Sequence, residues 1–203
     1  MIETLGIISV AVITSIVGPI LVEKVKSRLR NKKPVDPVVN DHEHCSVIAD
    51  EIEEVRKLLN ADRTWILMYH NGGHFLTNEK SMKKFSMMFE TCKDEKDTVS
   101  STFTNIPVSL YPHSTRELLH NKHIYIKDFN DSKVATYGLK GSAQSAGTRS
   151  SYVHALLDIK TENIVGSFGV DFKKKKSLTK AQLQELNDRS QRIAGFLSIY
   201  LNN

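Results

Sequence analysis

Two histidines bracket Asn71-Gly72-Gly73 in the segment YHNGGHF, residues 69–75. Imidazole rings can ligate a metal or line a pocket, and Asn-Gly favours a tight hairpin that would place His70 opposite His74. A metal site needs a third or fourth ligand, and no other His, Cys or carboxylate has suitable spacing. We therefore predict a hairpin turn, no metal site, and His70 and His74 as ligand-pocket residues. Turn chemistry alone also accounts for the glycines.

A second candidate site surrounds Arg149. A guanidinium group binds carboxylates or phosphates through paired hydrogen bonds, and hydroxyl groups can add further contacts. The sequence places several serines near this arginine: Ser142, Ser145, Ser150 and Ser151. The pattern predicts an anion site at Arg149, although a flexible serine-rich loop has the same composition.

Alternation in the segment IVGSFGVDF, residues 164–172, separates a polar set of side chains from an apolar set. Because successive side chains of a strand point to opposite faces, Phe168 and Phe172 share one face and Ser167 and Asp171 share the other. We include Ser167 and Asp171 among the predicted ligand-binding residues.

The two cysteines, Cys45 and Cys92, have neither disulfide-framework nor zinc-site spacing. We expect free thiols in a reducing compartment. Redox chemistry at Cys92 would need a resolving partner, and Cys45 precedes the predicted domain. The chain also has no P-loop, nucleophile elbow or HExxH motif. An enzyme that uses His70, His74 or Cys92 is therefore the least favoured interpretation, and no catalytic residue is predicted.

Hydrophobic periodicity predicts the elements that would position these residues. Apolar residues in 46–63 recur at steps of four and three, as in an amphipathic helix. β-Branched and aromatic runs predict strands in RTWILMYH, KFSMMFET, TVSSTFTNIPVSLY, HIYI, YVHALLDI and IVGSFGVDF. Helices are expected in STRELLHNK and in residues 178–201, where Thr179 and Gln182 would form a capping box. This order predicts an α+β domain.

The first 22 residues predict one transmembrane helix. Residues 4–22, TLGIISVAVITSIVGPILV, contain no charged side chain and are long enough to cross a hydrocarbon core of about 30 Å. Basic residues follow this run instead of preceding it, which favours a retained anchor over a cleaved signal peptide. The same charges predict a single-pass protein of the inner membrane with its C-terminal domain in the cytoplasm. The alternative is a buried helix of a soluble protein.

Residues 23–44 are predicted to be a basic stem and linker. Residues 23–33 carry six basic side chains and one acidic side chain, which accounts for the whole formal net charge of +5. Because the rest of the chain is balanced, we predict contact with membrane lipid through residues 4–33 and no nucleic-acid partner. Pro34 and Pro37 predict an extended linker.

Residues 45–203 resemble a GAF domain, a sensory relative of the PAS fold. The similarity is carried by LLNADRTWILMYHNGGHF, by HIYIKDFND, and by TRSSYVHALLDIKTENIVGSFGVDF with LTKAQLQELNDRSQRIAGFL. It implies an antiparallel sheet with the N- and C-terminal helices packed on one face, and a ligand cavity on the face of Ser167 and Asp171. The NKFDE motif of cyclic-nucleotide-binding members is absent, and no cysteine matches a bilin attachment site, so the cofactor stays unspecified.

The resemblance and the anchor together predict a membrane-anchored sensory or regulatory module that binds a small molecule or signals through dimerisation. A homodimer is expected because both terminal helices have seams that could continue past the domain. The alternative is a ligand-free scaffold that tethers a protein partner to the membrane, as bacterial or phage accessory proteins could do.

Overall fold

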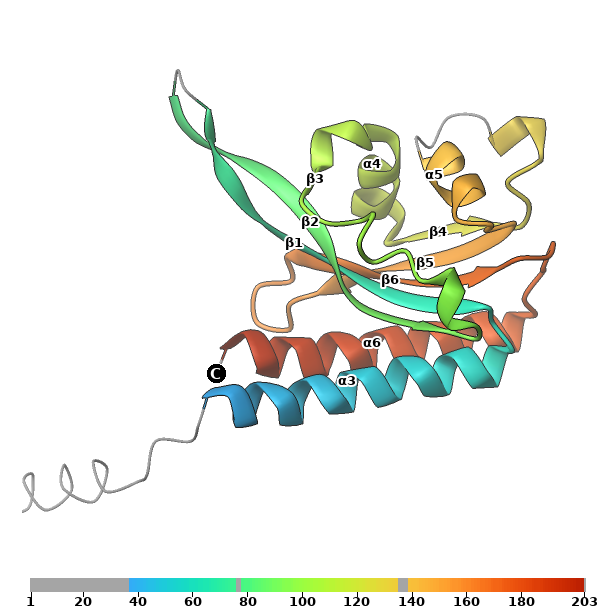
Figure 1. The fold of residues 1–203 in the computed structure, drawn as a ribbon, viewed down its shortest axis with the longest axis horizontal. Helices are drawn as coiled ribbons and strands as arrows, with labels where there is room; N and C mark the ends of the chain where they lie inside the picture. The colour runs from blue at the N-terminus through green and yellow to red at the C-terminus, as the bar shows by residue number, and fades with distance from the viewer. Residues whose placement is uncertain (1–36, 76–77, 135–138, 203) are drawn as a thin grey trace, which may run out of the picture. The chain divides into compact units, whose positions relative to one another are not determined.

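The computed structural model describes residues 37–75, 78–134 and 139–202 (Figure 1). The chain divides into two compact units, residues 1–40 and 41–203, and every strand belongs to the second. No helix in the described ranges combines the length and apolar character that a bilayer crossing requires. The predicted transmembrane helix at 1–22 and the basic stem at 23–33 lie outside the described residues.

The second unit is built on one six-stranded sheet whose strand order is β3-β2-β1-β6-β5-β4. All neighbouring strands are antiparallel, as predicted. The strands are β1 (Arg63–Phe75), β2 (Asn78–Cys92), β3 (Ile106–Pro107), β4 (His123–Ile126), β5 (Ser150–Leu157) and β6 (Ile164–Phe172). Strands β1 and β6, far apart in sequence, are the central pair.

Helices cover both faces of this sheet. Helices α3 (Pro37–Leu59) and α6 (Lys180–Asn202) lie side by side on one face, and α4 (Pro112–Asn121) and α5 (Leu139–Ser145) lie on the other (Figure 1). Three short 3₁₀ turns complete the unit: η2 (Glu95–Asp97), η3 (Val108–Leu110) and η4 (Ser132–Val134). The expected packing of the first and last helices on one sheet face is confirmed.

The larger core lies between the sheet and the pair α3 and α6. Its helix residues keep the predicted spacing and are fully or nearly fully buried: Ile48, Ile52, Val55 and Leu59 from α3, and Leu186, Ile193, Ala194 and Leu197 from α6. The predicted capping box begins α6, since the Gln182 amide donates to Thr179 Oγ1 at 3.2 Å and the Thr179 amide donates to Gln182 Oε1 at 3.0 Å.

The prediction of a hairpin turn at Asn71-Gly72-Gly73 is wrong. These residues lie inside β1, where the pairing with β2 shifts register between Asn71 and His74. Strand β1 continues to Phe75, which pairs with Asn78. His70 and His74 are therefore on one strand, not opposite each other. The glycines lie at an irregularity in the ladder, a second common position for glycine in strands.

Two other segments differ from the predicted elements. Residues 98–105 form turns and not a strand, and only Ile106–Pro107 pairs with β2. Glu90 explains the difference, because its carboxylate accepts from the Val99 and Ser100 amides at 2.9–3.1 Å and so satisfies donors that a strand ladder would otherwise use. Residues 37–44, predicted as extended linker, are helical, with Pro37 at the first position of α3, where proline is tolerated.

Candidate functional site

A cavity of about 90 Å³ lies on the sheet face that α4 and α5 cover. Its walls are mainly apolar side chains from β1, β2, β4, β5 and α4, with the small residues Ala143 and Ala146 at α5. The chief apolar lining residues are Trp65, Leu67, Met87, Leu118, Ile124, Ile126, Phe129 and Val153. This cavity is the candidate ligand site.

Small residues on β6 leave room for the large ones on β1. The Trp65 ring lies against Gly169, where an added Cβ would come within 2.1 Å of the ring. Any side chain at position 169 would therefore displace the indole from the cavity wall. Glycine is required at position 169 because the Trp65 ring lies too close to the backbone for a side chain.

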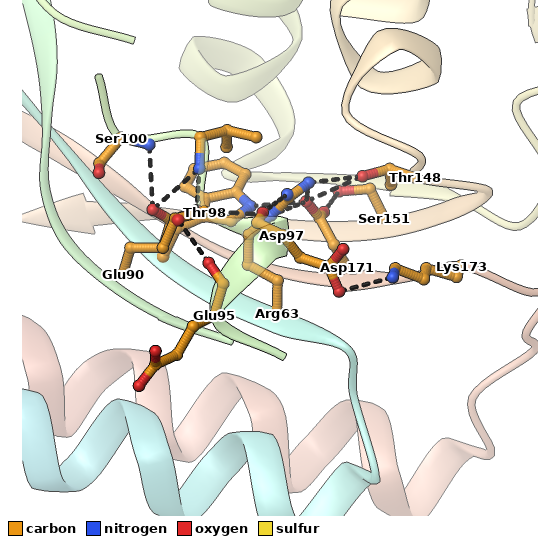
Figure 2. Close-up of polar contacts among 12 residues, drawn as sticks. Arg63, Glu90, Glu95, Asp97, Thr98, Ser100, Thr148, Ser151, Asp171 and Lys173 are labelled. Atoms are coloured by element: carbon orange, nitrogen blue, oxygen red, sulfur yellow. Dashed lines mark hydrogen bonds and ion pairs between the residues drawn. The ribbon is translucent and has the colours of Figure 1, made fainter. Parts of the chain in front are cut away.

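Part of the cavity lining belongs to a buried polar cluster, whose contacts are drawn in Figure 2. At its centre, Asp171 Oδ2 accepts from Arg63 Nη2 at 2.8 Å and from Trp65 Nε1 at 3.0 Å. Ser151 Oγ donates to Asp171 Oδ1 at 2.7 Å, and Arg63 Nη2 also donates to Thr148 Oγ1 at 2.7 Å. Arg63 and Asp171 are 4% and 6% exposed, so each charge depends on the other for compensation.

The guanidinium also ties the loop after β2 to the sheet. Arg63 Nη1 donates to the Asp97 carbonyl at 3.0 Å, and Arg63 Nε lies 3.9 Å from Glu90 Oε1. Glu90 in turn accepts the Val99 and Ser100 amides (Figure 2). The loop that carries the lining residues Val99 and Phe103 is thus held by the polar cluster.

The predicted site residues separate into two groups. Ser167 and Asp171 line the cavity, and their side chains lie opposite Phe168 and Phe172, as the alternation of β6 predicted. Arg149 does not line it, because it forms an ion pair with Asp128, holding the pKa of that carboxyl below its usual range. The expected anion site at Arg149 is therefore occupied by a neighbouring carboxylate.

His70 does not line the cavity. His70 lies on a separate cleft of about 500 Å³, and its Nε2 is 2.9 Å from Ser86 Oγ. The backbone of His74 lies further along β1, and its side chain falls outside the described residues. The cavity face of β1 carries positions 63, 65, 67 and 69, so alternation places His70 on the opposite face of the strand.

The polar and aromatic cavity side chains that sequence reasoning missed include Arg63, Trp65, Tyr69 and Tyr111. The alternation argument that identified Ser167 also applies to Arg63, Trp65 and Tyr69. Positions 63, 65, 67 and 69 share one face of β1, so an arginine at the start of a hydrophobic strand was a signal of a buried charge. Tyr111, whose hydroxyl is 3.1 Å from Ser142 Oγ, follows β3 and had no periodic signal.

Burial shifts the pKa values of two other groups, Tyr69 and Cys92. It raises the pKa of the Tyr69 hydroxyl, so this group stays protonated at neutral pH. It also raises the pKa of Cys92 to about 11, with Glu90 adding to the effect, which makes this thiol a poor nucleophile. Cys45 and Cys92 are free thiols, and neither lines the cavity. Among the described residues, no group of three or more His, Cys, Asp or Glu could hold a metal.

No protein-family model matches the sequence, and no curated protein matches it significantly. Solved structures do match. A phycoerythrobilin-bound GAF domain from a cyanobacterial phytochrome has a TM-score of 0.61 at 16% identity and aligns over 88% of this chain and 92% of its own. The GAF domain/HD domain protein from Geobacter sulfurreducens has a TM-score of 0.59 at 13% identity, over 82% of this chain and 99% of its own.

A far-red cyanobacteriochrome photoreceptor matches in the same way, with a TM-score of 0.56 at 11% identity over 92% of this chain and 98% of its own. Identities this low show the fold alone and carry no ligand or activity to this protein. The sheet, the paired terminal helices and the cavity between sheet and α4 are thus those of a protein with the GAF-domain fold.

Proposed function

We propose that this protein is a sensory or regulatory module that binds a small molecule in the cavity beside Asp171. The observation that carries the proposal is a hollow sheet face with a buried polar cluster, in a fold whose relatives include bilin-bound GAF domains. Binding sites combine apolar walls with a few placed polar groups in this way. Binding without catalysis is proposed, since the chain has none of the nucleophile or metal motifs sought in its sequence.

Membrane anchoring is part of the same proposal. It rests on the uncharged run at 4–22 and the basic stem at 23–33, which together favour one span, lipid contact, and a cytoplasmic domain at the inner membrane. Homodimerisation through α3 and α6 is supported by apolar side chains that both helices leave about half exposed: Val47, Leu58, Ile199 and Leu201.

Thermal unfolding of the full chain with a ligand panel tests this function. The panel contains cyclic and other nucleotides, haem, free amino acids, divalent metals and small neutral compounds. A ligand present at one hundred times its Kd adds roughly 2.7 kcal/mol and raises Tm by several degrees. We expect at least one such shift, and its loss in Ser167→Leu, which fills the cavity. A well-folded chain that no compound stabilises would refute ligand binding.

A ligand-free scaffold is the second candidate, and cavity size favours it. The volume of about 90 Å³ is well below the roughly 300–1,000 Å³ of common ligand pockets. Under this alternative the protein would hold a protein partner at the membrane through its exposed helix surfaces. Absence of any ligand-induced shift, together with a partner captured by the wild type and lost in Leu58→Asp, would favour the scaffold.

A further inference from the structure

The polar cluster of the cavity presents no free charge to a ligand. Asp171 accepts hydrogen bonds from four side chains, Arg63, Trp65, Thr148 and Ser151. Arg63 uses its remaining terminal nitrogen on the Asp97 carbonyl. A charged ligand would have to break these bonds or enter the buried site without a counterion, and both are costly. The cavity therefore discriminates against ions.

Ser167 supplies a buried hydrogen-bonding group that remains open. Its side chain is 3% exposed and lines the cavity, and its hydroxyl makes no hydrogen bond within the described parts of the chain. Buried hydroxyls are nearly always paired, so one that faces a cavity requires a partner supplied from outside the protein. A hydroxyl both donates and accepts, so it can bind an alcohol, a carbonyl or an amide.

The walls and the volume of the cavity constrain the polarity and the size of the ligand. Leu67, Met87 and Val153 surround the space with apolar surface. At about 90 Å³ the cavity is smaller than the roughly 150 Å³ of an engineered apolar cavity that binds benzene. About six non-hydrogen atoms, the number in benzene, is therefore the upper limit for a ligand of this cavity.

The cavity and the outer cleft that contains His70 share part of their walls. Three residues, Tyr69, Thr115 and Leu118, line both the cavity and the outer cleft that contains His70. The Tyr69 ring also meets Phe85 edge-on, with centroids 6.4 Å apart.

We infer that the cavity binds a small, uncharged, mainly apolar molecule with one hydrogen-bonding group, which Ser167 holds. The inference rests on the ligand-binding function proposed above and names the class of ligand. It excludes nucleotides, amino acids and other ions from this cavity in the geometry described.

Three probes that share a cyclopentyl ring test the ligand class: cyclopentanol, protonated cyclopentylamine of the same size, and the larger anion cyclopentanecarboxylate. Trp65 is the only tryptophan and lines the cavity, so its fluorescence reports binding in the full chain, and none of the probes absorbs at the excitation wavelength. We expect saturable binding of cyclopentanol with a Kd about ten-fold or more below that of either ion.

Variants then locate the contact. Ser167→Ala should weaken cyclopentanol binding about five-fold, and Ser167→Leu should abolish it by filling the space. Ser190→Ala is the matched control: Ser190 is also 3% exposed, but its hydroxyl bonds to the Asn187 carbonyl in α6. Circular dichroism establishes that each variant is folded, and Ser167→Ala keeps the test valid if the leucine variant is not.

Each remaining outcome overturns the inference. Tighter binding of the carboxylate or the amine would leave ligand sensing intact and refute the uncharged class. Equal binding by wild type and Ser167→Ala would refute the role of Ser167. No binding of any probe would also refute the class, whereas the proposed sensory function would fail only if the wider thermal panel gave no shift.

Discussion

The two faces of the sheet are made by the same strands and differ in almost every physical respect. On the side of α3 and α6, β6 contributes Phe168, Val170 and Phe172 to a continuous apolar core. On the side of α4 and α5, the same strand contributes Ser167 and Asp171 to a cavity with a buried ion pair. One face is filled and apolar, while the other is hollow and partly polar.

This difference indicates that one face of the sheet stabilises the domain and the other forms the binding site. Close packing of the helix side supplies most of the apolar burial that stabilises the domain. A cavity forfeits dispersion contacts, and a buried ion pair costs desolvation energy, so the second face is less favourable than an apolar filling would be. Such local costs are typical of binding sites. The comparison makes four predictions.

Removal of the arginine from the ion pair should have the largest effect. Arg63→Met leaves Asp171 buried without a counterion and should lower the free energy of unfolding by about 3–5 kcal/mol in denaturant titrations. The double variant Arg63→Met/Asp171→Asn should recover only part of the loss, because the buried Glu90 carboxylate still lacks its cation. Arg149→Met is the control, since the Arg149 side chain is 39% exposed and its pair should contribute less than about 1 kcal/mol. Equal losses of unfolding free energy in Arg63→Met and Arg149→Met would contradict a larger contribution from the buried ion pair.

Titration of His154, which lies on the helix side of the sheet, should show that burial keeps its side chain neutral. Burial, with a smaller effect from His123, lowers the pKa of His154 from 6.5 to about 4. The unfolded state therefore binds the proton first, so this stability is complete above pH 6.5 and is lost as pH falls toward 4. The loss should reach about 3 kcal/mol.

The variant His154→Gln isolates this contribution. Glutamine can still bond to the Tyr125 hydroxyl, which lies 2.9 Å from His154 Nε2, but it does not titrate. The difference in unfolding free energy between wild type and variant should shrink between pH 6.5 and pH 4. A constant difference across this range would show that His154 is not held neutral.

A methyl group at Gly169 should damage the cavity face. Gly169→Ala places a carbon against the Trp65 ring and should cost about 1–3 kcal/mol, with a shifted tryptophan emission. Gly141→Ala is the matched control in α5, because nothing lies within 4 Å of the added carbon and helix propensity should stabilise by about 0.5–1 kcal/mol. Unchanged emission in Gly169→Ala would show that the indole does not depend on this glycine.

A pair of valines should give the smallest effect and the most direct comparison of packing. Val170 faces the filled core and Val153 lines the cavity, and both are nearly fully buried. Val170→Ala should cost about 1 kcal/mol more than Val153→Ala, because Val153 already lacks neighbours on one side. Chemical denaturation measures both. The prediction fails if Val153→Ala costs as much as Val170→Ala.

Sequence periodicity was sufficient for the sheet, the two terminal helices and the polar face of β6. It failed where long-range contacts decide the local structure. The amides of Val99 and Ser100 bind a carboxylate on β2, so residues 98–105 do not continue as a strand. Asn-Gly is a strong turn signal, yet the register of β1 with β2 places the chain reversal after Phe75.

The candidate site was predicted only in part, again because some of its contacts are long-range. Alternation along β6 is local information, and it correctly placed Ser167 and Asp171 on one face. The partner of Arg149 is Asp128, 21 residues earlier, and the partner of Arg63 is Asp171, 108 residues later. No local pattern distinguishes an arginine that is available to a ligand from one already paired across the fold.

Methyl-resolved NMR of the full chain during a cyclopentanol titration tests the difference between the faces most directly. The account predicts saturable shifts at cavity-side methyl groups such as Leu67, Leu118 and Val153. It predicts almost none at the helix-side methyl groups of Leu186 and Leu197. Shifts spread equally over both faces, or confined to the helix side, would contradict the assignment of the hollow face as the binding face.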